Sequence, residues 1–353
     1  MTLYIGVDFH PHQQTVAWCD TETGETGTVD LLHDGEAVQG FFGTLPGPAV
    51  VGIEASNRAA WFEKMLFENG HELFVGNPVL IRKRAVSRHK SDRRDAELIL
   101  GLLLRGEFPA IWRRPAESAG VIEVLGLRQS LVRQRTQVYN RLQALAHNAG
   151  LPKGRMRTLA YRAVVREAVM DETAGFARTQ LLGLAEELDR RIAEAEVWLK
   201  RKAGESGAVR LLMTQSGVGY LTALATVHTL GDVRRFGRLS KQVAAFAGLD
   251  PVERSSAGKV RFGSISKAGS PLLRYHLVYA AHIAARFDAR LKSFYKRLAK
   301  RKTKAVAKTA AARKLLVKLA IMLRDNITAE EFDLRGTRSR QCPSGSGSEM
   351  TAV

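Results

Sequence analysis

The first 80 residues alternate short apolar runs with turn-forming residues, and this pattern restricts the N-terminal part of the chain to a small set of folds. Three runs come first, LYIGVDFH, QTVAWCD and GTVDLL, with Gly, Thr and Asp between them. Two further runs, AVVGIEA and HELFVGNP, flank a helical segment, RAAWFEKMLFENG. Three meander strands followed by strand, helix and strand indicate an α/β domain with a mixed sheet.

A helix is predicted from about residue 91 to residue 105. Its apolar face is formed by Ala96, Ile99, Leu100 and Leu103. Ser91 precedes this face in the position of an N-cap. The first turn of the helix then carries Asp92 and Asp95, which share one side of it because they are three residues apart.

Two more acids close apolar strands: Asp8 ends the first strand and Glu54 the fourth. A carboxylate at the end of a buried strand is costly unless it is paired, hydrogen-bonded or bound to a cation. Together with Asp92 and Asp95 these residues can form a set of oxygen ligands without cysteine, which favours Mg²⁺ or Mn²⁺ over zinc. Alternatively, the two aspartates only complement the helix dipole and Glu54 is a solvated loop acid.

Basic residues surround the paired aspartates, which favours a phosphate-binding site over simple charge pairing. They are Arg82, Lys83, Arg84, Arg88, Lys90, Arg93 and Arg94. Two metal ions held by such acids can stabilise the entering and leaving oxygens of a phosphodiester substitution. His10 and His12, beside the first acid, are interpreted as polar loop residues in preference to metal ligands.

Residues 116–205 lack strand-like alternation, and their spacing predicts two long helices separated by a loop around GLPKGRM. The apolar residues at heptad-like spacing are Val124, Leu131, Val138 and Leu145 in the first helix, and Leu181, Leu184, Leu188, Ala195 and Trp198 in the second. Gln134 and Arg141 interrupt this seam. A helical hairpin within one chain and a coiled coil that joins subunits are therefore equal alternatives.

Residues 206–330 are predicted to form a mainly α domain with a glycine-rich middle. Between residues 286 and 324 there are 14 Lys and Arg residues and one acid, Asp288. A helical stripe of Leu315, Leu316, Leu319 and Leu323 runs through the same stretch. This combination indicates a packed helix with a basic outer side. The tail, 331–353, ends in small polar residues and is expected to be disordered.

The chain has a formal charge of +19, from 54 Lys+Arg and 35 Asp+Glu. Such an excess makes a polyanion the expected partner, because neutralising phosphates releases counterions. Cys19 and Cys342 are the only cysteines, which excludes a disulfide framework and a cysteine-rich zinc site and fits a reducing cytoplasm. The apolar stretches are too short for a membrane span and no signal peptide is recognised, so we expect no membrane role.

The segment ERSSAGKVRFGSISKAG contains Ser255, Ser256, Ser264 and Ser266 among glycines and basic residues. The residues alone favour an anion-binding loop over a nucleophilic serine, because no His or Asp near them is an obvious activating base. SSAGKV lacks the spacing of a P-loop, so no nucleotide cofactor is expected. Upstream, SGVGYLTAL fits either a helix-hairpin-helix turn that binds phosphate or a simple glycine cap.

Three stretches, YIGVDFH, VGIEAS and KSDRRDAELI, resemble the IS110 family of insertion-sequence transposases, which have an RNase H-like (RuvC-like) N-terminal domain. Their acids match the family's Asp, Glu, Asp, Asp set as Asp8, Glu54, Asp92 and Asp95. Residues 211–236 and 242–274 resemble the family's transposase domain. The resemblance implies a RuvC-like metal-binding catalytic domain over 1–115, a helical coiled-coil or dimerisation region over 116–205 and a transposase domain over 206–330.

The resemblance also implies a nucleophile, Ser256, because the family has a serine just before a glycine pair in this loop. Ala257 replaces the first of those glycines here, and Ser255 remains an alternative. Ser256 would attack phosphorus beside the metal-binding acids and leave a 5′-phosphoserine and a free 3′-hydroxyl, without ATP. The basic residues expected to neutralise phosphate charge are Lys259, Arg261, Lys267 and Arg274.

As partners, the resemblance implies donor and target DNA, a noncoding bridge RNA, and a homodimer that assembles to a tetramer with active sites built across subunits. It implies a place in the bacterial cytoplasm, at the nucleoid. Two other functions stay open. One is a metal-dependent Holliday-junction resolvase or nuclease that uses the same acids with water as the nucleophile. The other is a non-enzymatic nucleic-acid-binding protein whose acids are helix caps; a kinase-like ATPase is more distant.

Overall fold

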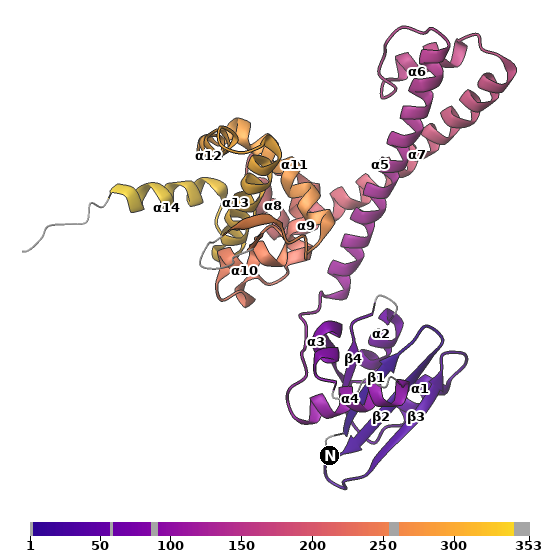
Figure 1. Cartoon of the computed structure of the whole chain (residues 1–353), viewed down its shortest axis with the longest axis vertical. Coiled ribbons are helices and arrows are strands. Elements are labelled where there is room, and N and C mark those ends of the chain that lie inside the picture. Colours follow the sequence, from indigo (N-terminus) through magenta and orange to yellow (C-terminus); the bar gives the residue numbers. More distant parts are fainter. Residues whose placement is uncertain (1–2, 57–58, 86–90, 254–260, 342–353) are drawn as a thin grey trace, which may run out of the picture. The chain divides into compact units, whose positions relative to one another are not determined.

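The computed structural model of the chain describes residues 3–56, 59–85, 91–253 and 261–341. The chain divides into two compact units, Met1–Arg113 and Arg114–Val353 (Figure 1). The second unit contains both the predicted helical region and the predicted transposase domain, and the boundary between them at residue 205 stays a prediction. Among the described residues no helix is both long and apolar enough to span a bilayer.

The first unit is built on a five-stranded mixed sheet in the order β3-β2-β1-β4-β5 (Figure 1). The strands are β1 (Leu3–Phe9), β2 (Gln13–Asp20), β3 (Thr26–Leu32), β4 (Ala49–Glu54) and β5 (Glu72–Gly76). β1, β2 and β3 pair antiparallel, whereas β4 pairs parallel with both β1 and β5. The predicted meander followed by strand, helix and strand is confirmed, and the arrangement is compatible with an RNase H-like domain.

Within the described residues of this unit, four helices accompany the sheet: α1 (Ala37–Gly43), α2 (Ala60–Glu68), α3 (Pro78–Lys83) and α4 (Asp92–Leu104). The helix α1 was not predicted, because seven residues are too few for a clear helical period. Phe42 of α1 and Phe62 of α2 join the core that contains Val7 and Ile53. Trp61 of α2 is exposed.

The helix α4 packs against the other face of the sheet, where β1 and β4 carry Gly6 and Gly52. A Cβ atom on Gly6 would lie 2.3 Å from the carbonyl oxygen of Ala96 and 2.4 Å from the nitrogen of Leu100, both in the backbone of α4. A Cβ on Gly52 would meet the side chains of Ile99 and Leu103. The absence of side chains at these two positions therefore sets how closely α4 approaches the strands.

The substitution Gly6→Ala should force α4 away from the sheet, since backbone atoms cannot yield as a flexible side chain can. We expect a loss of about 3 kcal/mol in the free energy of unfolding, measured by urea denaturation. Gly40→Ala is the control in the same unit, because a Cβ at this position in α1 meets nothing within 4 Å. It should stabilise the helix by up to about 1 kcal/mol. Equal stability of the two variants would contradict the close packing.

The second unit begins with a helical hairpin of α5 (Ala116–Asn148) and α7 (Glu172–Glu205), joined by a connection that contains the short helix α6 (Leu159–Glu167). The two long helices were predicted and α6 was not. Val138, Leu188 and Ala195 are buried as the heptad pattern predicts, whereas Leu184 is exposed and its neighbour Ala185 is buried instead. The packing of α5 on α7 within one chain accounts for the seam, and a coiled coil between subunits stays a prediction.

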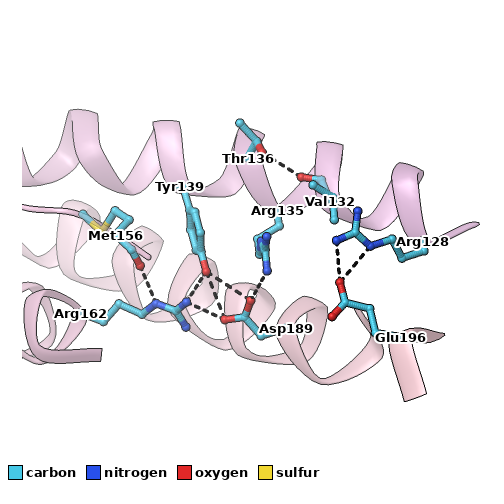
Figure 2. Close-up of polar contacts among 9 residues, drawn as sticks. All are labelled: Arg128, Val132, Arg135, Thr136, Tyr139, Met156, Arg162, Asp189 and Glu196. Carbon is cyan, nitrogen blue, oxygen red and sulfur yellow. Dashed lines mark hydrogen bonds and ion pairs between the residues drawn. The ribbon is translucent and has the colours of Figure 1, made fainter. Parts of the chain in front are cut away.

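A polar network ties α5, α6 and α7 together near the middle of the hairpin (Figure 2). The Arg162 side chain, only 4% exposed as a residue, donates to the Asp189 carboxylate at 2.6 Å and to the carbonyl of Met156 at 2.7 Å. It also donates to the Tyr139 hydroxyl, which in turn donates to Asp189. Arg135 donates to the same carboxylate at 2.8 Å. One aspartate thus compensates two arginines.

Replacing this carboxylate by Asp189→Asn should destabilise the hairpin by about 3 kcal/mol, because it leaves the buried Arg162 guanidinium without its counter-ion. Burial acts to raise the pKa of Asp189, but the hydrogen bonds from Arg135 and Arg162 outweigh it and the pKa is lowered. The stabilisation is accordingly present above the ordinary aspartate pKa and is lost as the pH falls through the lowered value. Thermal melts at neutral pH measure the destabilisation expected for Asp189→Asn. Glu187→Gln, on the exposed side of α7, is the control. An equal decrease in melting temperature in both variants would show that the Asp189 network does not stabilise the hairpin more than an exposed ion pair does.

The remainder of the second unit is mainly helical. Its elements are α8 (Gly207–Met213), α9 (Tyr220–Leu230), the 3₁₀ turn η1 (Val233–Arg235), α10 (Leu239–Phe246), β6 (Pro251–Glu253), β7 (Phe262–Ile265), α11 (Pro271–Phe287), α12 (Ala289–Ala299), α13 (Lys304–Asp325) and α14 (Ala329–Gln341). Leu315, Leu316 and Leu319 of the predicted stripe of α13 are buried in the core, and Leu323 is partly buried against it. The basic stretch 286–324 forms the end of α11 and two further helices. The helix α14 occupies residues where the sequence predicted a disordered tail from 331; residues 342–353 lie outside the described part.

Candidate active site

Asp8 and Glu54 lie at the carboxyl ends of neighbouring parallel strands. They directly follow Val7 and Ile53, which are paired in register across β1 and β4. Because side chains alternate along a strand, Asp8 shares its face with Gly6 and Glu54 shares its face with Gly52. This is the face that α4 covers, as the close approach of α4 to both glycines requires. The fold therefore directs both acids toward the side of the sheet that carries α4.

The other two predicted acids, Asp92 and Asp95, lie in the first turn of α4, as expected. Ser91 is the N-cap: its hydroxyl accepts a hydrogen bond from the backbone N–H of Arg94 at 3.4 Å, and its carbonyl accepts one from Asp95. The helix begins at this point because the cap satisfies one of its free N–H groups. The partial positive charge of the helix start favours the two carboxylates that follow.

His10, interpreted from the sequence as a polar loop residue, follows β1 and lies beside the acids. Its Nε2 atom lies 3.1 Å from Oδ2 of Asp8 and 3.5 Å from Oδ1 of Asp92. One ligand atom from each of these three residues lies within 4.8 Å of the others, the spacing of a candidate metal site. The signal in the sequence was the two-residue spacing from Asp8, which places both side chains on one side of an extended chain. His12 is exposed and does not belong to this group.

The electrostatics of Asp8 reflect its crowded surroundings. Burial raises the pKa of Asp8 above its ordinary value; His10 opposes this rise, whereas the charges of Asp95 and Asp92 add to it. Asp95 therefore acts on Asp8 although it lies outside the close group. Glu54 is half-buried and also lies outside that group. The structure thus brings Asp8, Asp92 and His10 into direct proximity, with Asp95 near enough to repel Asp8.

The donor set fits a divalent cation. Burial and, to a lesser degree, the charges of Asp95 and Asp92 raise the pKa of Asp8, and His10 does not cancel this rise. A cation of charge +2 would remove this repulsion. Carboxylate oxygens suit Mg²⁺ and Mn²⁺, and the added imidazole is a common ligand of transition metals such as Mn²⁺ to Zn²⁺. The predicted Mg²⁺ or Mn²⁺ stays a prediction.

The predicted nucleic-acid-binding residues near this centre lie around the end of α3. Arg82, Lys83 and Arg84 are exposed there and available to solvent or a ligand. Arg88 and Lys90 lie outside the described residues. Arg93, one of the basic neighbours of the acids, pairs with Glu97 one turn along α4 at 2.9 Å. Among the described basic residues near the acids, Arg93 is therefore engaged in an ion pair, whereas Arg82, Lys83 and Arg84 are exposed.

The serine segment is carried by a short hairpin in the second unit. Strands β6 and β7 pair antiparallel, with Pro251 opposite Ile265 and Glu253 opposite Phe262. Ser255, Ser256 and Lys259 lie between these strands, outside the described residues. The paired residues of β6 and β7 form the neck of this hairpin, on either side of the serine segment. Arg261 and Lys267, predicted to neutralise phosphate, are exposed at this neck.

The neck is closed by a contact that the sequence did not reveal. Ser266 donates its backbone N–H to the carbonyl of Asp250 at 2.9 Å and its hydroxyl to the Asp250 carboxylate. This contact joins residues 16 positions apart in the sequence, so no local pattern reports it. Ser266 therefore joins the two ends of the hairpin through Asp250.

Residues on the two sides of the neck also pack closely through their backbones. Gly248 has a φ of +65°, and a Cβ on it would lie 2.7 Å from the nitrogens of Ala268 and Gly269. One guanidinium nitrogen of Arg274 donates hydrogen bonds to the carbonyls of Ala247, at 3.1 Å, and Gly269, at 2.6 Å. Arg274 therefore has a structural role in joining the two sides of the neck, beside the phosphate role predicted for it.

The turn in SGVGYLTAL connects α8 and α9. Gly217 has a φ of +85°, and a Cβ there would lie 2.5 Å from the nitrogen of Ala284 in α11. Gly219 precedes α9 as an N-cap without a side chain. Packing against α11 is sufficient to explain Gly217, and phosphate binding by this turn stays a prediction.

Two protein-family models match this chain, one in its N-terminal part and one in its C-terminal part. Residues 5–149 match a DEDD-type family model from IS110 elements described as "Transposase", and residues 209–296 match a model described as "Transposase IS116/IS110/IS902 family". A "Probable family 20 transposase" of Pseudomonas aeruginosa is 31% identical over 255 residues, which cover 70% of this chain and 75% of that protein.

Two further relatives are named after insertion sequences. The "Transposase for insertion sequence element IS1111A" of Coxiella burnetii is 32% identical over 58% of this chain, and the match spans 57% of that relative. The "Transposase for insertion sequence element IS1328" of Yersinia enterocolitica is 27% identical over 79% of this chain and 83% of its own length.

Proposed function

The chain belongs to the IS116/IS110/IS902 family of insertion-sequence transposases, and we propose that it cleaves and rejoins DNA strands through a covalent bond between Ser256 and a 5′-phosphate. The observation that carries the proposal is the convergence of Asp8, Asp92 and His10 at one end of the sheet. A buried acid and a half-buried acid, with exposed basic residues in the same unit, suit a phosphodiester substrate better than a purely structural role does.

The acidic centre would hold one or two divalent cations, Mg²⁺ or Mn²⁺. We assign Asp8, Asp92 and His10 as ligands from their proximity, and Glu54 and Asp95 as ligands from their direction toward the same region and their match to the family's acids. A bound cation would supply charge neutralisation at the scissile phosphate. The acids themselves fix where that phosphate is positioned, because they are attached to a sheet and a capped helix.

In the proposed reaction the hydroxyl oxygen of Ser256 attacks phosphorus and forms a new P–O bond. The bond from phosphorus to the 3′-oxygen breaks, and that oxygen leaves as a 3′-hydroxyl with a proton. In the second step the 3′-hydroxyl of the exchanged strand attacks the same phosphorus and releases the serine. The number of phosphodiester bonds is conserved, so no nucleotide cofactor is required. Arg261 and Lys267 at the neck of the hairpin, with Lys259, would neutralise phosphate charge during both steps.

The proposed partners are donor and target DNA, guided by a noncoding bridge RNA, with a homodimer assembling to a tetramer. The net charge of +19 supports binding of several phosphate backbones. If guidance is by RNA, DNA flanking the gene should contain a segment whose folded loops are complementary to the insertion site. Copies of the element that all lack such a segment would count against guidance without affecting the proposed chemistry.

One observation favours a second candidate, a metal-dependent resolvase or nuclease. The group of Asp8, His10 and Asp92 lies wholly within the first unit. Water would then be the nucleophile. The experiment that separates the two is incubation with labelled element-end DNA and Mg²⁺, followed by denaturing electrophoresis. A protein-linked DNA band supports the transposase chemistry, whereas cleaved DNA with free ends in every condition supports the nuclease.

A further inference from the structure

The helix α11 presents two tyrosines to solvent beside the serine hairpin. Tyr275 is 49% exposed and Tyr279 is 62% exposed. They are four residues apart, so they lie on the same side of the helix, one turn from each other. Both line two different pockets, one on each side of this pair. Exposed aromatic rings between two pockets are more typical of a binding surface than of a solvated helix face.

The first of these pockets, the α5 pocket, lies between α5, α9 and α11 and has a volume of about 460 Å³. This volume is within the range of about 300–1,000 Å³ that small-molecule sites have. Arg128, Arg135 and Arg157 line it. Arg128 is held by Glu196, to which its Nε donates at 3.0 Å, and Arg135 is held by Asp189 (Figure 2). These acids orient two guanidinium groups in advance of any ligand.

A buried histidine lines the same pocket. His276 is 5% exposed, and within the described parts of the chain its Nε2 has no hydrogen-bond partner. Burial, with a smaller contribution from the charge of Arg128, lowers the pKa of His276 to about 4. The imidazole is therefore neutral at physiological pH and has one N–H donor and one acceptor nitrogen. A neutral ring of this kind suits the edge of a nucleobase better than it suits a phosphate.

The second pocket, the hairpin pocket, has a volume of about 490 Å³ and lies on the other side of the tyrosines. Its wall includes Ile265 at the end of β7, and its basic residues are Lys267, Arg274 and Lys308. A path from this pocket across Tyr275 and Tyr279 to the α5 pocket has aromatic rings in its centre and positive charge at both ends. Proteins that bind single-stranded nucleic acid use this combination of stacking rings and cations.

We propose that α11 binds an unpaired stretch of nucleic acid, with bases stacked on Tyr275 and Tyr279, one base inserted in the α5 pocket toward His276, and the flanking phosphates neutralised by Arg157 and Lys308. The inference deepens the proposed function by naming the form of nucleic acid at this surface. Its test does not depend on the catalytic serine. An unpaired strand beside the serine hairpin is what an exchange of strands between two duplexes requires.

The full-length protein would be titrated with short single strands that contain 2-aminopurine, as RNA and as DNA of one sequence, and with the matching duplex. Stacking on a tyrosine should quench the 2-aminopurine fluorescence. Each change, Tyr275→Ala or Tyr279→Ala, should weaken single-strand binding roughly tenfold and reduce the quenching. Tyr279→Phe keeps the ring and should retain both. Phe176→Ala, which removes an exposed ring from α7, is the control and should change neither.

Duplex binding should be the same in all these variants, which separates the tyrosine path from general attraction to phosphate. The strand type that binds more tightly identifies RNA or DNA as the occupant. Unchanged single-strand affinity in a variant that carries both Tyr275→Ala and Tyr279→Ala would overturn the proposal. Reduced self-association of that variant with unchanged affinity would overturn it too, since a second copy of the chain would then cover the tyrosines. Absence of a Ser256 adduct with intact quenching would contradict the proposed function alone.

Discussion

Ser256→Ala is expected to abolish the covalent protein–DNA product and to reduce strand cleavage by at least about 10³-fold. The expected loss is large because the methyl group cannot form the P–O bond on which both steps of the proposed reaction depend. Binding of DNA should persist, since the hydroxyl contributes little to contact with the backbone. The measurement is the rate of strand cleavage and of adduct formation with labelled element-end DNA in Mg²⁺, resolved by denaturing electrophoresis.

Two serine variants are the controls for this experiment. Ser255→Ala tests the neighbouring residue that the sequence pattern leaves as an alternative nucleophile. Ser264→Ala tests an exposed serine of β7 in the same hairpin. Both should retain cleavage within a few-fold of the unmodified chain. An inactive Ser255→Ala with an active Ser256→Ala would transfer the role to Ser255, and full cleavage by both would favour water as the nucleophile.

Asp8→Asn is expected to have two effects of opposite kind. Strand cleavage should fall by at least about 10³-fold, because the substitution removes a charged ligand from the proposed cation site. The metal-free protein should nevertheless become more stable. Burial and the charges of Asp95 and Asp92 raise the pKa of Asp8, so the folded state disfavours its ionised form. A neutral amide of nearly the same shape removes that penalty and can still contact His10.

The sign of the pH dependence follows from the raised pKa. Asp8 favours the folded state most at pH values below the ordinary aspartate pKa, and this contribution is lost as the pH rises through the folded value. In the presence of chelator, the increase in melting temperature caused by Asp8→Asn should therefore be larger at pH 7 than near pH 3. Asp34→Asn, at an exposed position, should show no such difference. A lower melting temperature of Asp8→Asn at pH 7 would mean that the carboxylate is a structural partner and not a ligand awaiting a cation.

The sheet and α4 were predictable because their sequences carry clear periods. Alternating apolar residues marked the strands, and Ser91 followed by an apolar stripe marked the start of α4. The direction of Asp8 and Glu54 follows from the same alternation. The packing of α4 on Gly6 and Gly52 was not predictable, since a glycine in a strand does not indicate which element approaches it. The contact of His10 with Asp92 was not predictable either, because it depends on that packing.

In the second unit the sequence predicted long helices better than it predicted their contacts. The heptad pattern selected Leu184, which is exposed, because a pattern read along one helix does not include the side chains of its partner. The contact between Asp250 and Ser266 joins residues on either side of the serine segment, and no local pattern reports it. The assignment of Ser256 rests on the resemblance to the family, and the residue lies outside the described part of the chain.

Mass spectrometry of the protein–DNA product tests the central claim most directly. After reaction with element-end DNA in Mg²⁺, nuclease digestion of the DNA and proteolysis of the protein, the account predicts a nucleotide joined through its 5′-phosphate to the peptide that contains Ser256. The same product should be absent from Asp8→Asn. Efficient strand cleavage without any nucleotide attached to the protein, or a nucleotide attached at a residue outside the hairpin, would contradict the account.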